Sequence, residues 1–148
     1  QLSSSYAYTA DMGREVGTHS GAHYFTIGQR KGLNVGGTPE PLFVIATDTD
    51  ENIVYTGQGS EHPGLYRPAL FIQQSEVHWV RNDLKLKIGE SANYLARIRY
   101  RQSLEKATLF QQEDGLYILF DRPQKSIAKG QFAAWYQEDE LIGSGVIS

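Results

Sequence analysis

Residues 106–121, with the sequence KATLFQQEDGLYILFD, decide the fold class of this chain. Two short runs, 106–112 and 115–121, contain β-branched and aromatic residues and flank the turn signal Glu-Asp-Gly. Such runs, separated by a few residues that include glycine, are typical of two strands joined by a hairpin. Neither run has the spacing of an amphipathic helix. The stretch therefore predicts an antiparallel β-hairpin.

The same pattern recurs before and after this hairpin. Runs at 69–80, 92–101, 131–137 and 140–148 are separated by turn signals. About six short strands at this spacing predict a six-stranded antiparallel β-barrel over residues 69–148. Within the last run, Gly-Ser-Gly at 143–145 indicates close backbone packing.

The first part of the chain also has strand-like runs, at 22–28, 41–48 and 52–59. They predict a small β-rich module over residues 1–68, in which residues 1–12 are left unassigned. The boundary is placed near Pro68, because proline and glycine interrupt the pattern between 60 and 68. The fold class is therefore mainly β.

The composition excludes several classes of protein. With 40 % apolar residues, the chain of 148 residues can form a packed core. No apolar run approaches the ~20 residues of a membrane span, so no membrane partner is expected. The absence of cysteine excludes disulfides, thiolate metal sites and a cysteine nucleophile, and it fits a cytoplasmic protein. Because the chain starts at Gln1 and its only methionine is Met12, we expect it to be part of a longer protein.

The charge is unevenly distributed along the chain, whose formal net charge is −3. Residues 85–106 have a local net charge of +4, whereas residues 1–84 carry −4 and residues 107–148 carry −3. A local basic patch on an acidic body favours a negatively charged partner that binds in one orientation.

The basic segment includes the stretch LARIRYRQ at 95–102. If it is a strand, the three arginines at 97, 99 and 101 share one face, because side chains alternate between faces. Tyr100 would then lie on the other face, either in the core or exposed near a strand end. The row is either a solvated face or a recognition face, since arginine forms bidentate phosphate contacts and stacks on bases. Gln102 is a further polar candidate.

Two other groups of residues suggest weaker sites. The glycine-rich segment 28–37 contains Arg30 and Lys31, which could contact phosphate, but it has neither a Walker A loop nor a dinucleotide fingerprint. A flexible turn is the simpler interpretation. The four histidines lack the acidic neighbours and spacing of a metal site, so no metal is expected. No residue is predicted to be catalytic.

Five separated motifs resemble, in this order, the second half of the bacterial tRNA-specific 2-thiouridylases. They are HYFTIGQRKGLNVGGT (23–38), GQGSEHPGLY (57–66), EVHW (76–79), RIRYRQ (97–102) and KGQFAAWY with LIGSGVI (129–147). The resemblance implies a central domain followed by a β-barrel similar to those of translation factors. Family members also have an N-terminal ATP-pyrophosphatase domain. With ATP and magnesium they adenylate the wobble uridine of tRNAs for lysine, glutamate and glutamine, and a cysteine persulfide, supplied by a sulfur-donor protein, delivers sulfur.

This chain has neither the Ser-Gly-Gly-Val-Asp-Ser-type ATP loop nor any cysteine. The resemblance therefore implies a fragment without its own cofactor, inactive alone, that contacts tRNA. The family's tRNA-contacting Arg-Tyr pair corresponds to Arg99 and Tyr100, and the glutamine of its Pro-Gly-Gln turn corresponds to Gln131. Lys129 replaces the proline of that turn. Arg97, Arg101, Arg30 and Lys31 are weaker candidates, chosen from charge and spacing.

Two alternatives remain open from the sequence. One is a stand-alone RNA-binding barrel, and the other is a protein–protein interaction module in which FAAWY and VHWV form an interface. Methyl transfer has no support, because no cofactor-binding glycine motif is followed by an acidic ribose ligand.

Overall fold

The computed structural model describes residues 7–148, so half of the unassigned stretch 1–12 lies outside the described residues. Its contacts form two compact units, one that extends to Tyr66 and one that comprises Arg67–Ser148. That these units are two domains with a boundary near Pro68 stays a prediction. Short 3-10 helices are η1 (Ala10–Met12), η2 (Ala22–Tyr24), η3 (Pro63–Leu65), η4 (Gln74–Glu76) and η5 (Asn82–Leu84).

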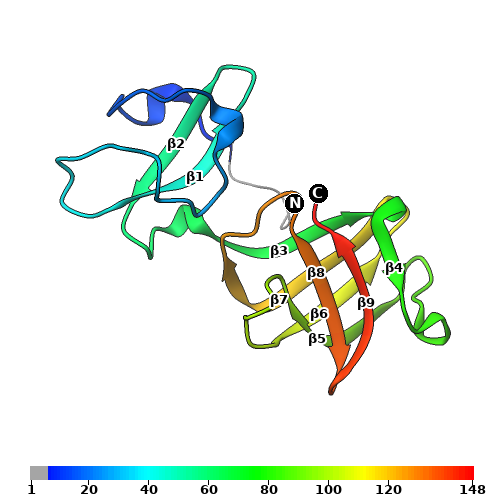
Figure 1. The fold of residues 1–148 in the computed structure, drawn as a ribbon. Coiled ribbons are helices and arrows are strands. Elements are labelled where there is room, and N and C mark those ends of the chain that lie inside the picture. The colour runs from blue at the N-terminus through cyan, green and yellow to red at the C-terminus, as the bar shows by residue number, and fades with distance from the viewer. Residues whose placement is uncertain (1–6) are drawn as a thin grey trace. The chain divides into compact units, whose positions relative to one another are not determined.

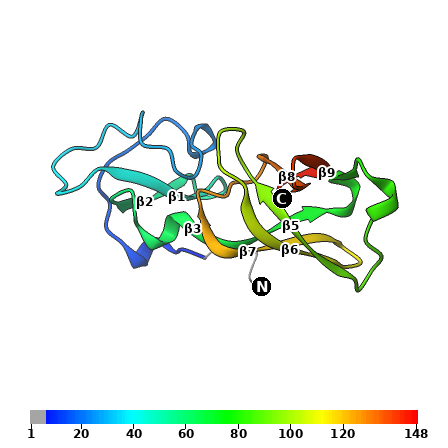
Figure 2. The same ribbon diagram turned by 90° about the horizontal axis from the view of Figure 1, so that it is seen from below.

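The second unit is built on one antiparallel sheet of seven strands in the order β3-β7-β6-β5-β8-β9-β4. Figure 1 shows β8 and β9 in front of β5, β6 and β7, and Figure 2 shows β6 and β7 on the side away from β8 and β9. The sheet is therefore strongly curled. The strands are β3 (Tyr66–Gln73), β4 (Val77–Trp79), β5 (Ser91–Arg97), β6 (Glu105–Gln111), β7 (Gly115–Lys125), β8 (Phe132–Gln137) and β9 (Glu140–Val146).

Closure of the sheet depends on the segment that runs from β3 through η4 to β4. This continuous segment supplies both edge strands, because β3 pairs with β7 and β4 pairs with β9. Beyond β9, the N–H of Ser148 donates to the carbonyl of Phe71 at 2.9 Å, which joins the end of the chain to β3. The predicted mainly β, antiparallel barrel is confirmed.

The expected count of six strands is wrong by one. The run 69–80 was predicted as one strand, but η4 divides it into β3 and β4. Gln74 accounts for the break, because its N–H donates to the carbonyl of Asp114 at 3.1 Å and its side-chain oxygen accepts from Gln111 at 2.7 Å. These contacts bind the bend to the β6–β7 hairpin predicted from residues 106–121.

Tryptophan packing fills the barrel interior. Trp135 on β8 is fully buried and meets Trp79 on β4 edge to face, with ring centroids 5.3 Å apart. The glycines of β9 make room for this packing. A Cβ added to Gly143 would overlap the Trp135 ring and lie 2.9 Å from the carbonyl oxygen of His78, and one added to Gly145 would lie 2.6 Å from Ile72 Cγ2. Close backbone packing at 143–145, expected from the sequence, is confirmed.

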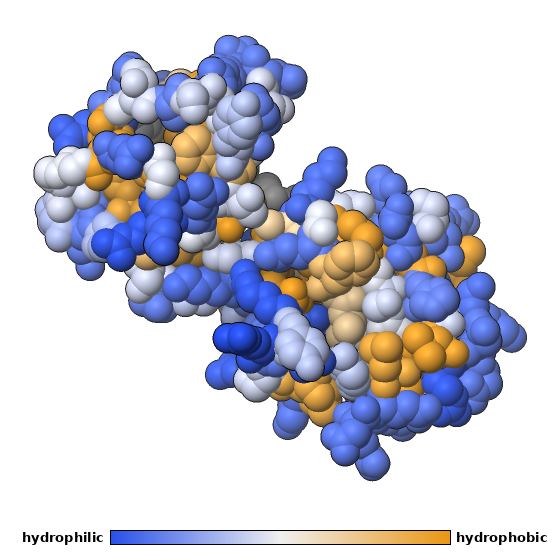
Figure 3. Space-filling view, viewed as in Figure 1, coloured by the Kyte–Doolittle hydropathy of each residue, from blue (hydrophilic) through white to orange (hydrophobic). Residues whose placement is uncertain are grey.

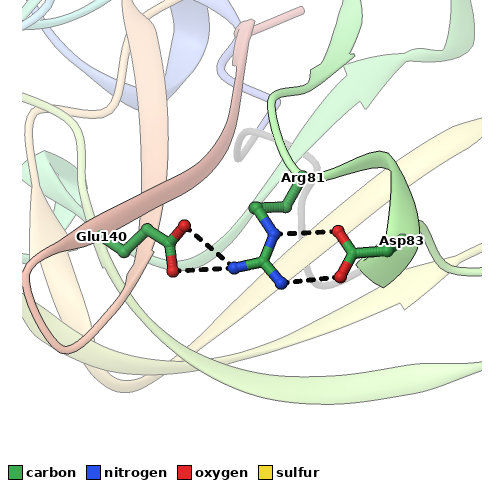
Figure 4. A network of polar contacts seen from close by, with 3 residues as sticks. All are labelled: Arg81, Asp83 and Glu140. Atoms are coloured by element: carbon green, nitrogen blue, oxygen red, sulfur yellow. Dashed lines mark hydrogen bonds and ion pairs between the residues drawn. The ribbon is translucent and has the colours of Figure 1, made fainter.

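An ion-pair network joins the β4–η5 connection to the β8–β9 turn. Arg81 lies between two carboxylates (Figure 4), donating to Asp83 at 2.6 and 2.8 Å and to Glu140 at 2.8 and 2.9 Å. The hydrogen bonds from Arg81 lower the pKa of Asp83 below its usual value.

The first unit contains the hairpin of β1 (Leu42–Asp48) and β2 (Ile53–Gln58), as predicted for 41–48 and 52–59. Asp48 holds the turn, since its carboxylate accepts from the N–H groups of Asp50 and Glu51 at 3.1 and 3.0 Å. Leu42 and Val44 of β1 form a small apolar core with Leu33.

The strand expected at 22–28 is wrong. Residues 22–24 form η2, and the backbone near residue 28 makes only two hydrogen bonds with β1, both with Val44, at 2.7 and 2.9 Å. Gly28 has a positive φ of 90°, a left-handed conformation that ends extended pairing. The aromatic and β-branched content of the run was therefore a misleading signal.

We expect Gly143→Ala to lower the free energy of unfolding by about 1–3 kcal/mol, because the added methyl group overpacks the Trp135 site. Urea denaturation followed by tryptophan fluorescence measures the change. Gly36→Ala is the control, since a Cβ there meets nothing within 4 Å. An equal effect of the two substitutions would contradict the packing role of Gly143.

The Arg81 network should stabilise the fold more at neutral pH than in acid. A folded-state pKa of Asp83 below its usual 3.8 means stabilisation above that pH and its loss as pH falls through the lowered value. We expect the difference in melting temperature between the parent chain and Arg81→Gln to shrink between pH 6 and pH 3. A difference independent of pH would argue against the ion pairs.

Candidate nucleic-acid interface

The arginine row does not lie on one strand, so that prediction is wrong. β5 ends at Arg97, and residues 98–102 form a turn. The turn forms because the side-chain oxygen of Gln102 accepts from the N–H of Ile98 at 2.9 Å, and the N–H of Gln102 donates to the carbonyl of Arg99 at 3.1 Å. The Ile98 side chain is buried and anchors the turn in the core.

Both polar atoms of the Gln102 side chain form hydrogen bonds that stabilise this turn. Besides accepting from Ile98, its amide nitrogen donates to the side chain of Gln124 at 2.6 Å. Gln124 is itself buried and donates to the carbonyl of Arg122 at 2.8 Å. The suggestion that Gln102 offers a free polar contact is therefore not supported.

Arg99 projects from the turn toward the segment 126–130. Its guanidinium donates to the carbonyl of Ser126 at 2.8 Å, while the residue as a whole stays exposed. Partial burial lowers the pKa of Arg99 from its usual value, but a guanidinium keeps its charge in proteins. Arg99 is thus a charged group whose orientation is fixed by one hydrogen bond.

Gln131 holds the same segment from its other end. Its side-chain oxygen accepts from the N–H of Ala128 at 3.0 Å, and its backbone is hydrogen-bonded to Ile147 at 2.8 Å. Gly130 adopts a positive φ of 92° in the turn that leads into β8. Arg99 and Gln131 therefore meet at one short segment of the barrel.

Arg97 lies between two tyrosines on the outer face of the barrel. Its guanidinium carbon is 5.2 Å from the ring centroid of Tyr100 and 5.0 Å from that of Tyr136, and it donates to the hydroxyl of Tyr136 at 3.0 Å. Tyr100 is 86 % exposed. Of the two positions considered for Tyr100, exposure near a strand end is confirmed.

The remaining basic candidates are exposed but less ordered by contacts. Arg101 extends from the turn into solvent. Arg30 and Lys31 belong to the first unit, next to Gly32 with a positive φ of 87°. The side chain of Gln29 stabilises that turn by donating to the carbonyl of Lys31 at 2.8 Å.

One exposed side chain of the barrel was not among the RNA-binding candidates from the sequence, where it appeared only within the FAAWY segment of the protein-interface alternative. Phe132, the first residue of β8, is 68 % exposed, whereas Ala133 and Trp135 are fully buried. Strict alternation along 131–137 was the signal that could have found it, because it assigns Phe132 to the outer face. Hydrophobic side chains do reach the surface of this unit among hydrophilic ones (Figure 3).

Residues 7–148 contain no cluster of three or more His, Asp or Glu side chains that could hold a metal ion. Over the same residues, no helix has the length and apolar character of a membrane span. Two of the four histidines accept local backbone hydrogen bonds. His62 accepts from the N–H of Gly64 at 3.0 Å, and His19 accepts from that of Gly21 at 3.0 Å.

Comparison with known proteins gives matches over both units. A family model described as an aminomethyltransferase beta-barrel domain matches residues 71–147, and one described as a tRNA methyl transferase PRC-barrel domain matches residues 3–58. Matched curated relatives are tRNA-specific 2-thiouridylases. The protein from Flavobacterium johnsoniae is 65 % identical over 95 % of this chain, and that from Christiangramia forsetii is 63 % identical over 99 %. The relative from Chlamydia trachomatis is 41 % identical over 93 %.

The fold and these matches define the class of the chain: a β-barrel protein whose matched relatives are tRNA-specific 2-thiouridylases. The chain belongs to the tRNA-specific 2-thiouridylase family. It spans only 36–37 % of the length of the three relatives named.

We expect Gln102→Ala to loosen the 98–102 turn, because the N–H of Ile98 loses its acceptor. A lost hydrogen bond of this kind costs about 1 kcal/mol, so exchange of the Ile98 amide hydrogen should become about fivefold faster. Nuclear magnetic resonance measures that exchange. Gln112→Ala, at an exposed position, is the matched control. Unchanged protection of Ile98 would refute the role of Gln102.

Proposed function

We propose that this chain docks tRNA for an ATP-dependent tRNA sulfurtransferase that makes 2-thiouridine at the wobble position. The observation that carries the proposal is the convergence of Arg99 and Gln131 on the segment 126–130, with the exposed Tyr100 next to Arg99 in the chain. These are the residues that correspond to the tRNA-contacting residues of the family. Membership of the chain in the family supports the same assignment.

The electrostatics agree with an RNA partner. Residues 97–104 and 126–137 contain Arg97, Arg99, Arg101 and Lys129 and no acidic residue. Arginine suits phosphate because its planar guanidinium donates two parallel hydrogen bonds. The chain as a whole is acidic, so the rest of its surface disfavours RNA bound elsewhere. Arg30 and Lys31 are proposed as additional phosphate contacts of the first unit.

The role proposed for the chain is positioning. Phosphate contacts fix the register and orientation of a nucleic acid without reading its sequence. A tRNA held by its body presents its anticodon loop at a defined place, which favours reaction there. The tRNAs expected from the resemblance are those for lysine, glutamate and glutamine, and such a partner implies a cytoplasmic protein.

The residues of this chain do not fit ATP and magnesium. The glycine-rich segment 28–37 lacks the Lys-Ser/Thr pair of a phosphate loop, and the described residues offer no acidic cluster for a metal. No cysteine is present to carry sulfur. ATP, magnesium and the sulfur-donor protein are therefore proposed only for the longer relatives' reaction, and no chemical step is assigned to this chain.

Binding of the chain to a glutamate tRNA transcript tests the docking role. We expect Arg99→Ala to weaken binding about fivefold at low salt. It should also reduce the slope of the logarithm of the binding constant against the logarithm of the salt concentration by about one. Fluorescence anisotropy across a salt series measures both quantities. Arg122→Ala is the control, since Arg122 is 75 % exposed but paired with Glu105 at 2.7 Å. Equal affinity of the two variants would count against docking at this face.

A further inference from the structure

Two large aromatic side chains are exposed in the basic segments 97–104 and 126–137 of the barrel. Tyr100 is 86 % exposed and Phe132 is 68 % exposed. Single exposed apolar residues are ordinary on protein surfaces. Here, however, two exposed rings occur in two segments, 97–104 and 126–137, whose charged residues are all positive. Exposed apolar groups gathered beside cations indicate a binding surface.

Strand register brings the two rings to the same area. Arg97 on β5 pairs with Ala134 on β8, so the next outward position on β8 is Phe132 and the residues after Arg97 lead to Tyr100. Arg97 itself contacts the Tyr100 ring. Phe132 therefore lies on the outer face of β8 next to the end of β5, and the exposed Tyr100 lies in the turn just beyond that end, against Arg97.

Small residues separate the aromatic side chains along this face. On β8, Ala134 lies between Phe132 and Tyr136 on the outward side, and its partner on β9 is Ser144. Along this face Phe132 is exposed, and Ala134 and Tyr136 are half-buried. Arg97 borders this face through its contacts with Tyr136.

We propose that Phe132 and Tyr100 form a stacking site for an unpaired nucleobase of the bound RNA. Aromatic rings stack on the faces of bases, which duplex RNA does not expose. Arg99 next to Tyr100 in the chain, and Lys129 three residues before Phe132, are both exposed and supply charge for the adjoining phosphates. This inference rests on the proposed function and adds that the barrel binds a single-stranded or extruded nucleotide of the tRNA.

The probe is a single-stranded RNA hexanucleotide that carries one 2-aminopurine, whose fluorescence falls when it stacks. We expect the 148-residue chain to quench it. Phe132→Ala should weaken binding at least about fivefold without changing the salt slope, because stacking of one base contributes about that factor or more. Phe132→Tyr keeps an aromatic ring and should retain both binding and quenching.

Three controls separate stacking from other causes. Val80→Ala removes an apolar side chain that is 48 % exposed beside the ion-paired Arg81, and it should have no effect. An abasic hexanucleotide should bind the parent chain and Phe132→Ala equally. Melting temperatures of the variants show that each is folded.

The outcomes distinguish the inference from the proposed function. If Phe132→Ala matches Val80→Ala while Arg99→Ala weakens tRNA binding, the stacking site is refuted and docking stands. If neither Phe132→Ala nor Arg99→Ala has an effect, both proposals fail. If Phe132→Ala instead abolishes self-association of the chain and leaves RNA binding intact, the two rings form a protein interface and the stacking site is overturned.

Discussion

The antiparallel pairing of β5 with β8 is the constraint on which the candidate site depends. Leu95, Ala96 and Arg97 pair with Tyr136, Trp135 and Ala134, in that order. A shift of one residue would turn either Trp135 toward solvent or Arg97 toward the core, since directly paired residues share a face and alternate side chains face opposite sides. The register is therefore fixed by the cost of exposing a fully buried tryptophan. The same register places Phe132 and Arg97 on the outer face of the barrel.

Local patterns in the sequence predicted much of the barrel but not its corners. The hairpin at 106–121 was predictable because its alternation and its turn lie within one short segment. The end of β5 was not, because it depends on a side-chain hydrogen bond from Ile98 to Gln102. The break at η4 likewise depends on Asp114 and Gln111, which are distant in sequence.

The candidate site shows the same division. Residue type and charge identified the basic segment, whereas the convergence of Arg99 and Gln131 on residues 126–130 required the folded chain. The sequence did not decide whether Tyr100 is buried or exposed, because the turn that exposes it contains no strong turn signal such as glycine or proline. Phe132 was missed because an aromatic residue in a strand is ordinarily taken as core.

Closure of the barrel also bears on how this unit folds. Its edge strands come from one continuous segment, while the partner of β4 is β9 and the partner of Phe71 is Ser148. Contacts between such distant parts of a chain form late in folding, because the entropy cost of closing a long loop comes before the contacts contribute favourable free energy. During synthesis on the ribosome, β3 can pair once β7 has emerged, whereas β4 must remain unpaired until β9, near the end of the chain, has been made.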